Sequence, residues 1–352
     1  MAFINFQPKD YFNTVLYNGT GSSQSITGVG FQPDWLWQKS RSNSQDGRIF
    51  DAVRGGSKVI YPSLTNAEST DAQLITSFDS DGFTMGSAGG NVNDSGTTNV
   101  AWNWRASGTS GSSNTDGSIT STVSANTTAG FSVVKWTGSG ANATIGHGLG
   151  AVPKMIIIKS LANTTFWMVY HSAIGNDSEI YLNKGDYVAS ASSTAWQDTD
   201  PTSSVFYVGG GGGDGVNVSG DYIAYCFAEK QGFSKFGSYS GLGTTTGQFV
   251  YTGFKPSFVM TKIATTGGSD DGGWVMVDNK RYPNNLSNSP ILFANLSNSE
   301  SDSYNAEFFS NGFRFNANSV TVNGSGNTYS YMAFAETPFV ANSGQSIPTT
   351  AR

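Results

Sequence analysis

Large apolar residues alternate with small or polar ones in three aromatic-rich segments of the chain. A period of two is the pattern of a strand that is buried on one face. The three alternating segments are residues 99–106, 222–229 and 329–336. Continuous apolar runs follow Pro33, Pro153 and Pro256, and a strand can begin after a proline without losing a ladder hydrogen bond. Because no segment shows a sustained apolar period of 3.6 with helix caps, we expect short strands and few helices.

The same markers occur three times in the same order. An aromatic-x-Gly-x-Gly element begins at Tyr17, Trp136 and Tyr239. A lysine stands six residues after each proline, at Lys39, Lys159 and Lys262. A phenylalanine stands 23 residues before the end of each alternating segment, at Phe83, Phe206 and Phe313. Such recurrence at fixed spacing indicates three tandem copies of one structural module.

We therefore predict an all-β protein made of three tandem related antiparallel β-sandwich or jelly-roll-like modules. Its length of 352 residues agrees with more than one hydrophobic core. The segment between the first two modules is rich in Gly, Ser and Thr, which is typical of a connector that is either flexible or draped over a neighbouring module. The expected parts are an N-terminal attachment arm at 1–13, modules at 14–106, 130–229 and 230–340, the connector at 107–129, and a C-terminal tail at 341–352.

Composition and charge argue against several functions. The net charge is −6 and no cluster of Lys and Arg occurs, so we expect no nucleic-acid partner. The only cysteine, Cys226, leaves no internal disulfide and no Cys-based zinc site. We expect synthesis in a cytoplasm and no membrane insertion, because the start lacks an export-signal pattern and no apolar run approaches membrane-spanning length.

Few residues suggest catalysis or metal binding. Asp79 and Asp81 would project from one face of a strand, as paired glycosidase carboxylates or the first ligands of a calcium loop do. The twelfth position of such a loop is Gly90 instead of Glu, so a polar turn is favoured over an ion site. His147 and His171 have no acidic residue at the helical spacing of a zinc site. We expect no enzymatic activity, no metal and no cofactor.

Other residues are candidates for structural or binding contacts. The recurring lysines are interpreted as structural residues whose stems cover apolar surface. The loop aromatics Trp196 and Tyr282 are candidates for ligand contact, since loops rich in Tyr, Ser, Gly and Asn form adaptable surfaces. The arm holds five large apolar side chains without counterparts in the repeats, which is typical of a contact surface: Phe3, Ile4, Phe6, Tyr11 and Phe12. The alternative is that the arm adds an edge strand to its own first module.

Many of these motifs resemble those of a family of tailed-phage virion proteins common in marine phages. The resemblance covers nearly the whole chain, and it is carried by residues 3–8, 17–21, 30–34, 53–55, 76–83, 101–104, 146–150, 222–229 and 251–256. It implies a structural, tail-fibre-like protein located in the virion, with other tail or capsid proteins as partners. It brings no catalytic residues.

The resemblance and the residues together favour a tail fibre or host-recognition appendage. We expect it to assemble as a homo-oligomer and to contact a host surface glycan or protein receptor. A capsid-decoration protein on the head surface is the close alternative. A polysaccharide depolymerase is disfavoured because no acid pair recurs across the modules. A host adhesin or lectin unrelated to phage is disfavoured by the missing export signal.

Overall fold

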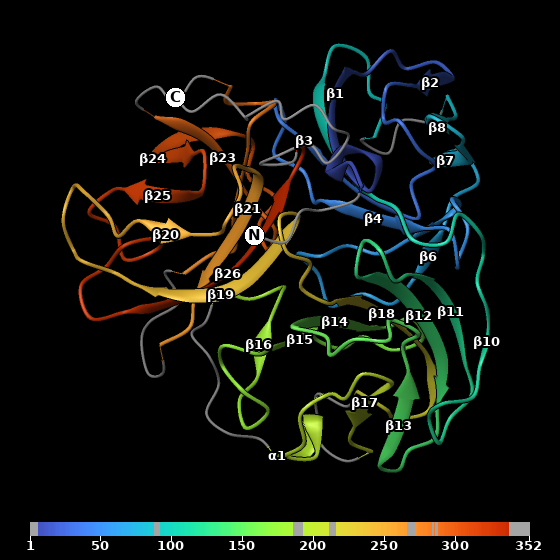
Figure 1. The fold of residues 1–352 in the computed structure, drawn as a ribbon. Helices are drawn as coiled ribbons and strands as arrows, with labels where there is room; N and C mark the ends of the chain where they lie inside the picture. The colour runs from blue at the N-terminus through green and yellow to red at the C-terminus, as the bar shows by residue number, and fades with distance from the viewer. Residues whose placement is uncertain are drawn as a thin grey trace.

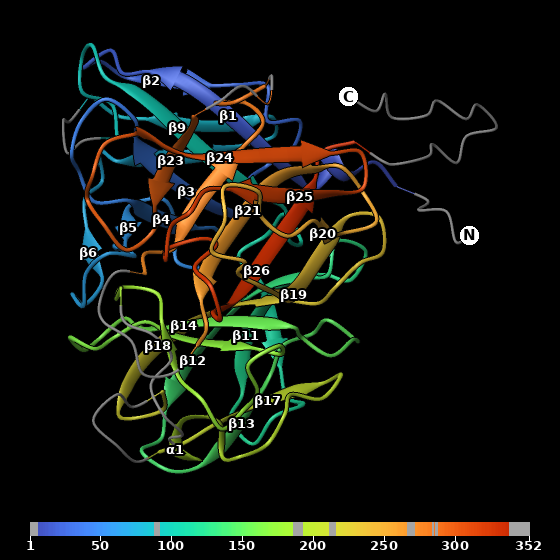
Figure 2. The ribbon, with the colours of Figure 1, turned by 90° about the vertical axis from the view of Figure 1, so that its left-hand side faces the viewer.

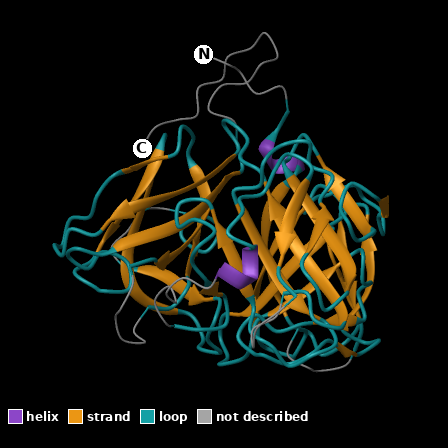
Figure 3. Cartoon of the chain, turned by 90° about the horizontal axis from the view of Figure 1, so that it is seen from below, coloured by secondary structure: helices purple, strands orange, loops and turns teal. Residues whose placement is uncertain are grey.

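The computed structural model describes residues 6–87, 92–185, 193–210, 216–265, 272–283, 285 and 288–337. In this part of the chain, helix is limited to a 3-10 turn η1, Pro8–Asp10, and one short helix α1, Ser193–Trp196. Figure 1 labels the strands, and Figure 3 shows them in orange between loops in teal. The prediction of an all-β fold with few helices is confirmed.

Three large antiparallel sheets have the same strand order. In each of them, the closing strand lies between the strand that enters the aromatic-x-Gly-x-Gly element and the strand that follows the proline. The first sheet runs β1 (Phe12–Asn18), β9 (Thr98–Trp104), β3 (Trp35–Ser40) and β4 (Arg48–Asp51). The second includes β12 (Phe131–Gly138), β18 (Gly220–Phe227), β14 (Met155–Ser160), β15 (Met168–His171) and β16 (Ile180–Tyr181). The third includes β19 (Ser234–Ser240), β26 (Thr328–Ala335), β21 (Pro256–Ile263), β22 (Val275–Asp278) and β23 (Ser289–Phe293).

The pairing register is repeated as well. Trp104 on β9 lies opposite Phe12 on one side and Trp35 on the other. The equivalent sets are Phe227 between Phe131 and Met155, and Phe334 between Ser234 and Phe258. Since a shift of one residue would turn every side chain to the other face, the shared register places equivalent side chains on equivalent faces.

A smaller set of strands covers each large sheet. The first set is β2 (Gln24–Ile26), β8 (Gly82–Met85) and β7 (Ile75–Asp79), and a separate hairpin pairs β5 (Lys58–Val59) with β6 (Ser69–Thr70). The second is β13 (Ala143–Gly146) with β17 (Val205–Val208), and the third is β20 (Val250–Tyr251), β25 (Gly312–Asn316) and β24 (Ser301–Phe309). In the third, β23 also pairs with β24, so the two sheets are continuous. An apolar cluster lies within each sandwich.

The segment expected to be a flexible connector is part of the second sheet. Strands β10 (Ser112–Asn114) and β11 (Ser121–Asn126) extend this sheet beyond β12. Ser121 is buried and its hydroxyl donates to the carbonyl of Gly146 at 2.9 Å. Of the two alternatives, the flexible connector was wrong and the connector lying on its neighbour agrees with the structure, because the backbone of small polar residues can form strand hydrogen bonds as well as coil. We therefore call residues 6–106 the first unit, 107–229 the second unit and 230–337 the third unit.

The three units are arranged around a common axis, along which Figure 1 looks, and Figure 2 shows them from the side. On this axis the equivalent residues Trp104, Phe227 and Phe334 contact one another pairwise. Their ring centroids are 6.5, 5.7 and 6.0 Å apart. One apolar cluster contains residues from all three units around these rings. The units thus form a ring closed around one shared aromatic core.

The aromatic-x-Gly-x-Gly element closes the end of each sandwich. In the first unit the Tyr17 hydroxyl donates to the carbonyl of Val92 at 2.7 Å, and the N–H of Gly21, at φ +70°, donates to the carbonyl of Asn93. A Cβ on Gly19 would lie 2.1 Å from the carbonyl oxygen of Asp94, so only glycine fits there. In the other units the backbone carbonyl of a buried asparagine accepts the equivalent hydrogen bond: Asn217 from the N–H of Gly140, and Asn323 from the N–H of Gly243.

Candidate functional site

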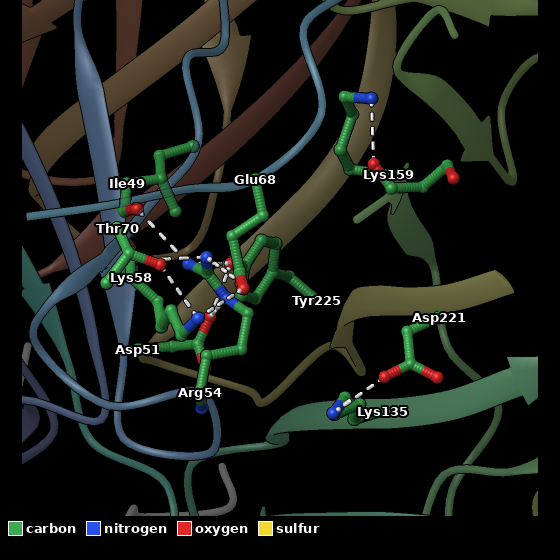
Figure 4. Close-up of polar contacts among 11 residues, drawn as sticks. Ile49, Asp51, Arg54, Lys58, Glu68, Thr70, Lys135, Lys159, Asp221 and Tyr225 are labelled. Atoms are coloured by element: carbon green, nitrogen blue, oxygen red, sulfur yellow. Dashed lines mark hydrogen bonds and ion pairs between the residues drawn. The ribbon is translucent and has the colours of Figure 1, made fainter. Parts of the chain in front are cut away.

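A buried polar cluster joins the first unit to the second. Asp51, the last residue of β4, accepts a hydrogen bond from the Tyr225 hydroxyl of β18 at 2.8 Å. Nε of Arg54 lies 2.5 Å from the same carboxylate, and both side chains are almost fully buried. Arg54 also binds Glu68 at 3.1 Å and donates to the carbonyl of Ile49 at 3.1 Å. Figure 4 shows these side chains converging at the junction.

Two groups of this cluster, Tyr225 and Arg54, have shifted pKa values. Burial, reinforced by the Asp51 carboxylate, raises the pKa of the Tyr225 hydroxyl well above its ordinary value, so it remains a donor. Burial acts to lower the pKa of the Arg54 guanidinium, but Asp51, Tyr225 and Glu68 together outweigh it and the net shift of the pKa is upward. The cluster is therefore suited to holding two units together.

The other two junctions use the same strand position. Asp278, the last residue of β22, receives the indole N–H of Trp102 from the first unit at 3.1 Å and pairs with Arg281. His171 is the last residue of β15, and its Nε2 atom lies 3.1 Å from the carbonyl oxygen of Tyr331 in the third unit. Nδ1 of His171 accepts a backbone N–H, which leaves Nε2 as the donor. Each junction is thus bridged by a buried polar side chain at the end of an equivalent strand.

A second contact strengthens the junction between the first and third units. The Glu300 carboxylate of the third unit pairs with Arg281 at 3.2 Å and with Arg41 of the first unit at 2.9 Å. The backbone N–H of Glu300 also donates to the carbonyl of Arg41. The ring is therefore closed between its first and last units by ionic as well as apolar contacts.

The three recurring lysines are fully buried and cap carbonyl groups. The ammonium of Lys39 donates to the carbonyls of Gln45 at 3.0 Å and of Leu296, in the third unit, at 2.7 Å. Lys262 reaches the carbonyl of Lys184 in the second unit, whereas Lys159 binds carbonyls of its own unit. Burial lowers the pKa of both Lys39 and Lys159 to about 8. The interpretation as stems covering apolar surface was incomplete, because the charged ends are buried too, and those of Lys39 and Lys262 bond across junctions.

The described part of the expected attachment arm packs against the protein itself. Phe12 begins β1, the edge strand of the first sheet, and is fully buried. Phe6 and Tyr11 pack against Phe233 of the third unit, with ring centroids 5.6 and 6.4 Å away. For these three residues the expectation of a free contact surface was wrong, because Phe12 is buried in the shared core of the ring and Phe6 and Tyr11 are partly buried against it. Two candidates of the arm lie outside the described residues, Phe3 and Ile4.

The two candidate ligand-contact residues are not accessible either. Trp196, at the end of α1, is only 1% exposed and packs its ring against Tyr170. Tyr282 is 8% exposed. Tyr282 lies in a polar loop, as the sequence indicated, whereas Trp196 ends a short helix, and both rings turn inward. The prediction of exposed contact residues was wrong because a loop position does not prevent an aromatic ring from reaching a core.

The acidic turn and the remaining histidine are satisfied within the chain. Asp81 accepts the backbone N–H groups of Gly28 and Gly30 at 3.1 and 2.6 Å. Asp79 accepts the hydroxyl of Thr84 at 2.6 Å, and Nε2 of His147 lies 3.1 Å from a backbone carbonyl. Among the described residues, no group of three His, Cys, Asp or Glu side chains could hold a metal ion. No helix of the described part is long and apolar enough to cross a membrane.

Comparison with known proteins assigns the family. Residues 7–338 match the family described as a domain of unknown function, DUF7483. The chain belongs to this family. Searches of the curated proteins and of the solved structures found no match. The DUF7483 match spans all three units of the ring.

The sequence analysis missed one exposed feature of this DUF7483 chain. Tyr251, on β20 of the small sheet in the third unit, is 64% exposed, and Phe249, directly before this strand, is 43% exposed. Their signal in the sequence was the alternation Phe249-Val250-Tyr251, in which Val250 points into the core. The equivalent residues of the first unit are polar, so comparison of the repeats would have revealed the difference.

Proposed function

We propose that this chain is a structural protein of a phage particle, acting as a compact host-recognition appendage of the tail. The observation that carries the proposal is the closure of three related sandwiches around one aromatic core, which makes a single rigid body from repeated parts. The resemblance of the repeated motifs to tailed-phage virion proteins supports the same assignment. Other virion proteins would be its partners, and several copies would assemble on each particle.

Rigidity is the property that a particle component needs most. The three junctions are bridged by buried polar contacts at equivalent strand ends, and each is flanked by core aromatics. Breaking one of these buried contacts would leave a buried polar group without a partner, which costs free energy. The units are therefore expected to keep their relative positions. Charged residues make up only 12% of the chain. Loops of uncharged polar residues and aromatics suit recognition by adaptable contacts.

A capsid-decoration protein is the second candidate, and the approximate threefold arrangement favours it. A chain with three similar units around an axis presents similar loops at three positions around that axis. Such a surface matches a threefold position of a symmetric shell, where one copy would make three similar contacts.

Labelling of intact particles tests both candidates. Particles of the phage that encodes this chain would be purified on a density gradient, analysed by mass spectrometry and imaged with a gold-labelled antibody against the purified protein. Label at the tail, together with competition of adsorption by the purified protein, is the expected result. Label spread over the head would favour the second candidate. Absence of the protein from purified particles would overturn both.

A further inference from the structure

We propose that the outer face of the small sheet in the third unit is a glycan-binding site that stacks an uncharged hexopyranose ring on Phe249, Tyr251 and Phe309. This inference names the ligand class of the recognition function proposed above and rests on it, although binding itself can be tested separately. The site is built from the register of β20, β24 and β25.

Three aromatic residues lie on this face around Gly312. Tyr251 is the most exposed large apolar side chain of the described residues. In the strand ladder Gly312 lies opposite Tyr251 on one side and opposite Phe309 on the other. A Cβ on Gly312 would lie 2.7 Å from Cζ of Phe249, so the Phe249 ring covers the glycine. The rings of Phe249 and Phe309 lie 5.5 Å apart at 73°.

A hydrogen-bonding rim borders the aromatic surface. Arg314 donates to Oε2 of Glu307 through Nε and Nη2, at 3.0 and 2.6 Å, and Asn316 donates to the same oxygen at 2.6 Å. The Arg314 guanidinium also lies 5.3 Å from the centroid of the Phe309 ring. All three hydrogen bonds reach Oε2, and none of them uses Oε1 of Glu307. Part of each charged side chain is open to solvent, at 28% for Arg314 and 24% for Glu307.

The chemistry of the face selects an uncharged, polyhydroxylated ligand. The charges of Glu307 and Arg314 cancel, so the face attracts neither an acidic nor a basic partner. A pyranose presents one apolar face of C–H groups and a rim of hydroxyls, which matches an exposed aromatic surface beside a few polar groups. An extended apolar partner would leave the polar rim unsatisfied.

The first unit shows that the fold does not require these aromatics. By register, Ser25 stands at the place of Phe249, Thr84 at that of Arg314 and Asp79 at that of Phe309. These side chains bind one another, with the Ser25 and Thr84 hydroxyl oxygens 2.7 Å apart and Thr84 donating to Asp79 at 2.6 Å. Because the equivalent positions of the first unit hold small polar residues, the fold itself does not require exposed aromatic rings in the third unit. Exposed apolar patches of this kind mark binding surfaces.

Binding of defined glycosides to the full chain tests the inference. Saturation-transfer NMR would be recorded with methyl glycosides of glucose, galactose, mannose and N-acetylglucosamine, and with methyl sialoside as the charged probe. We expect transfer to the ring protons of at least one neutral glycoside and none to the sialoside. The variants Tyr251→Ala and Phe249→Ala should each weaken binding about tenfold, the equivalent of about 1.4 kcal/mol.

Leu16→Ala is the matched control, because Leu16 is 40% exposed in the first unit. This variant should bind the glycosides as the unchanged protein does. Thermal unfolding should show that all three variants are folded. Binding of none of the neutral glycosides, binding of the sialoside alone, or equal binding by Tyr251→Ala would overturn the inference. Self-association that Tyr251→Ala abolishes, without glycoside binding, would assign the face to a second copy and overturn it as well. Presence in particles without glycoside binding would refute only this inference, whereas binding by a protein absent from particles would refute only the proposed function.

Discussion

Replacing Phe227 by alanine removes one of the three rings that meet on the axis of the molecule. The side chain is 1% exposed. Its ring lies within 6.5 Å of five other aromatic rings, drawn from all three units: Trp35, Trp104, Phe131, Phe236 and Phe334. The change therefore opens a cavity at the point where every unit contributes to the core.

The expected loss of stability is large. Truncation of a buried phenylalanine costs about 3–5 kcal/mol, and the cost rises with the volume that the surroundings fail to fill. The walls of this cavity belong to three separate sheets held by their own ladders, so they have little freedom to move inward. We therefore expect a loss near the upper end, about 4–5 kcal/mol.

Urea unfolding followed by circular dichroism would measure this loss, and hydrogen exchange with mass spectrometry would report each unit separately. Phe206→Ala is the matched control, since Phe206 is fully buried within the second unit only. Because the units share one core, we expect a single transition in both variants, with exchange protection lowered in all three units.

Two results would refute the reasoning. A loss below about 1 kcal/mol for Phe227→Ala would mean that the central rings are not tightly packed. A second unit that unfolds before the other two in Phe206→Ala would mean that the sandwiches are independent domains that merely touch.

Three further predictions concern buried polar groups. Arg54→Met leaves the Asp51 carboxylate without its charged partner at the junction, and it should lower the free energy of unfolding in urea by about 3–5 kcal/mol. The control Lys58→Met removes a half-exposed partner of Glu68 and should lower it by less than about 1 kcal/mol. Burial lowers the pKa of His171 from 6.5 to about 4. As the pH falls, the unfolded chain therefore binds a proton at this histidine before the folded chain does. The contribution of His171 to the free energy of unfolding is complete above pH 6.5, and about 3 kcal/mol of it is lost by pH 4. His171→Asn should flatten that dependence, and an unchanged slope would contradict the assignment. Asn323→Ala removes side-chain hydrogen bonds to three backbone groups and should lower the free energy of unfolding by about 3 kcal/mol, while an unchanged midpoint would show that this loop is not held by the asparagine.

Local patterns were enough to identify strands and to recognise repetition. Alternation at Trp102 and Trp104 reports which face of a strand is buried, because side chains of a strand point to opposite faces in turn. The glycine pair of the aromatic-x-Gly-x-Gly element reports a tight loop, because it needs positive φ and close backbone approach. The Val-Asn pairs before the closing strands carried the same kind of signal and were overlooked.

Contacts between distant residues could not be deduced in this way. The partner of Tyr225 is Asp51, and the partner of Lys39 is a carbonyl in the third unit; neither pairing leaves a trace in local spacing. The same limit explains the errors at Phe12, which is buried against the third unit, and at Trp196, which is buried against a distant strand of its own unit. It also explains the connector, whose composition fits both a coil and the edge of a sheet.

The amino-acid sequence by itself determined the strand character, the threefold repetition of markers and the positions of the core aromatics, because these depend on local periodicity and on the few conformations open to each residue. Tertiary structure alone decided that the repeats close into a ring, that Trp104, Phe227 and Phe334 meet on its axis, and that Phe249 and Tyr251 remain outside. The physical reason is that burial is a property of assembled surfaces: a side chain is removed from water only when another part of the chain covers it.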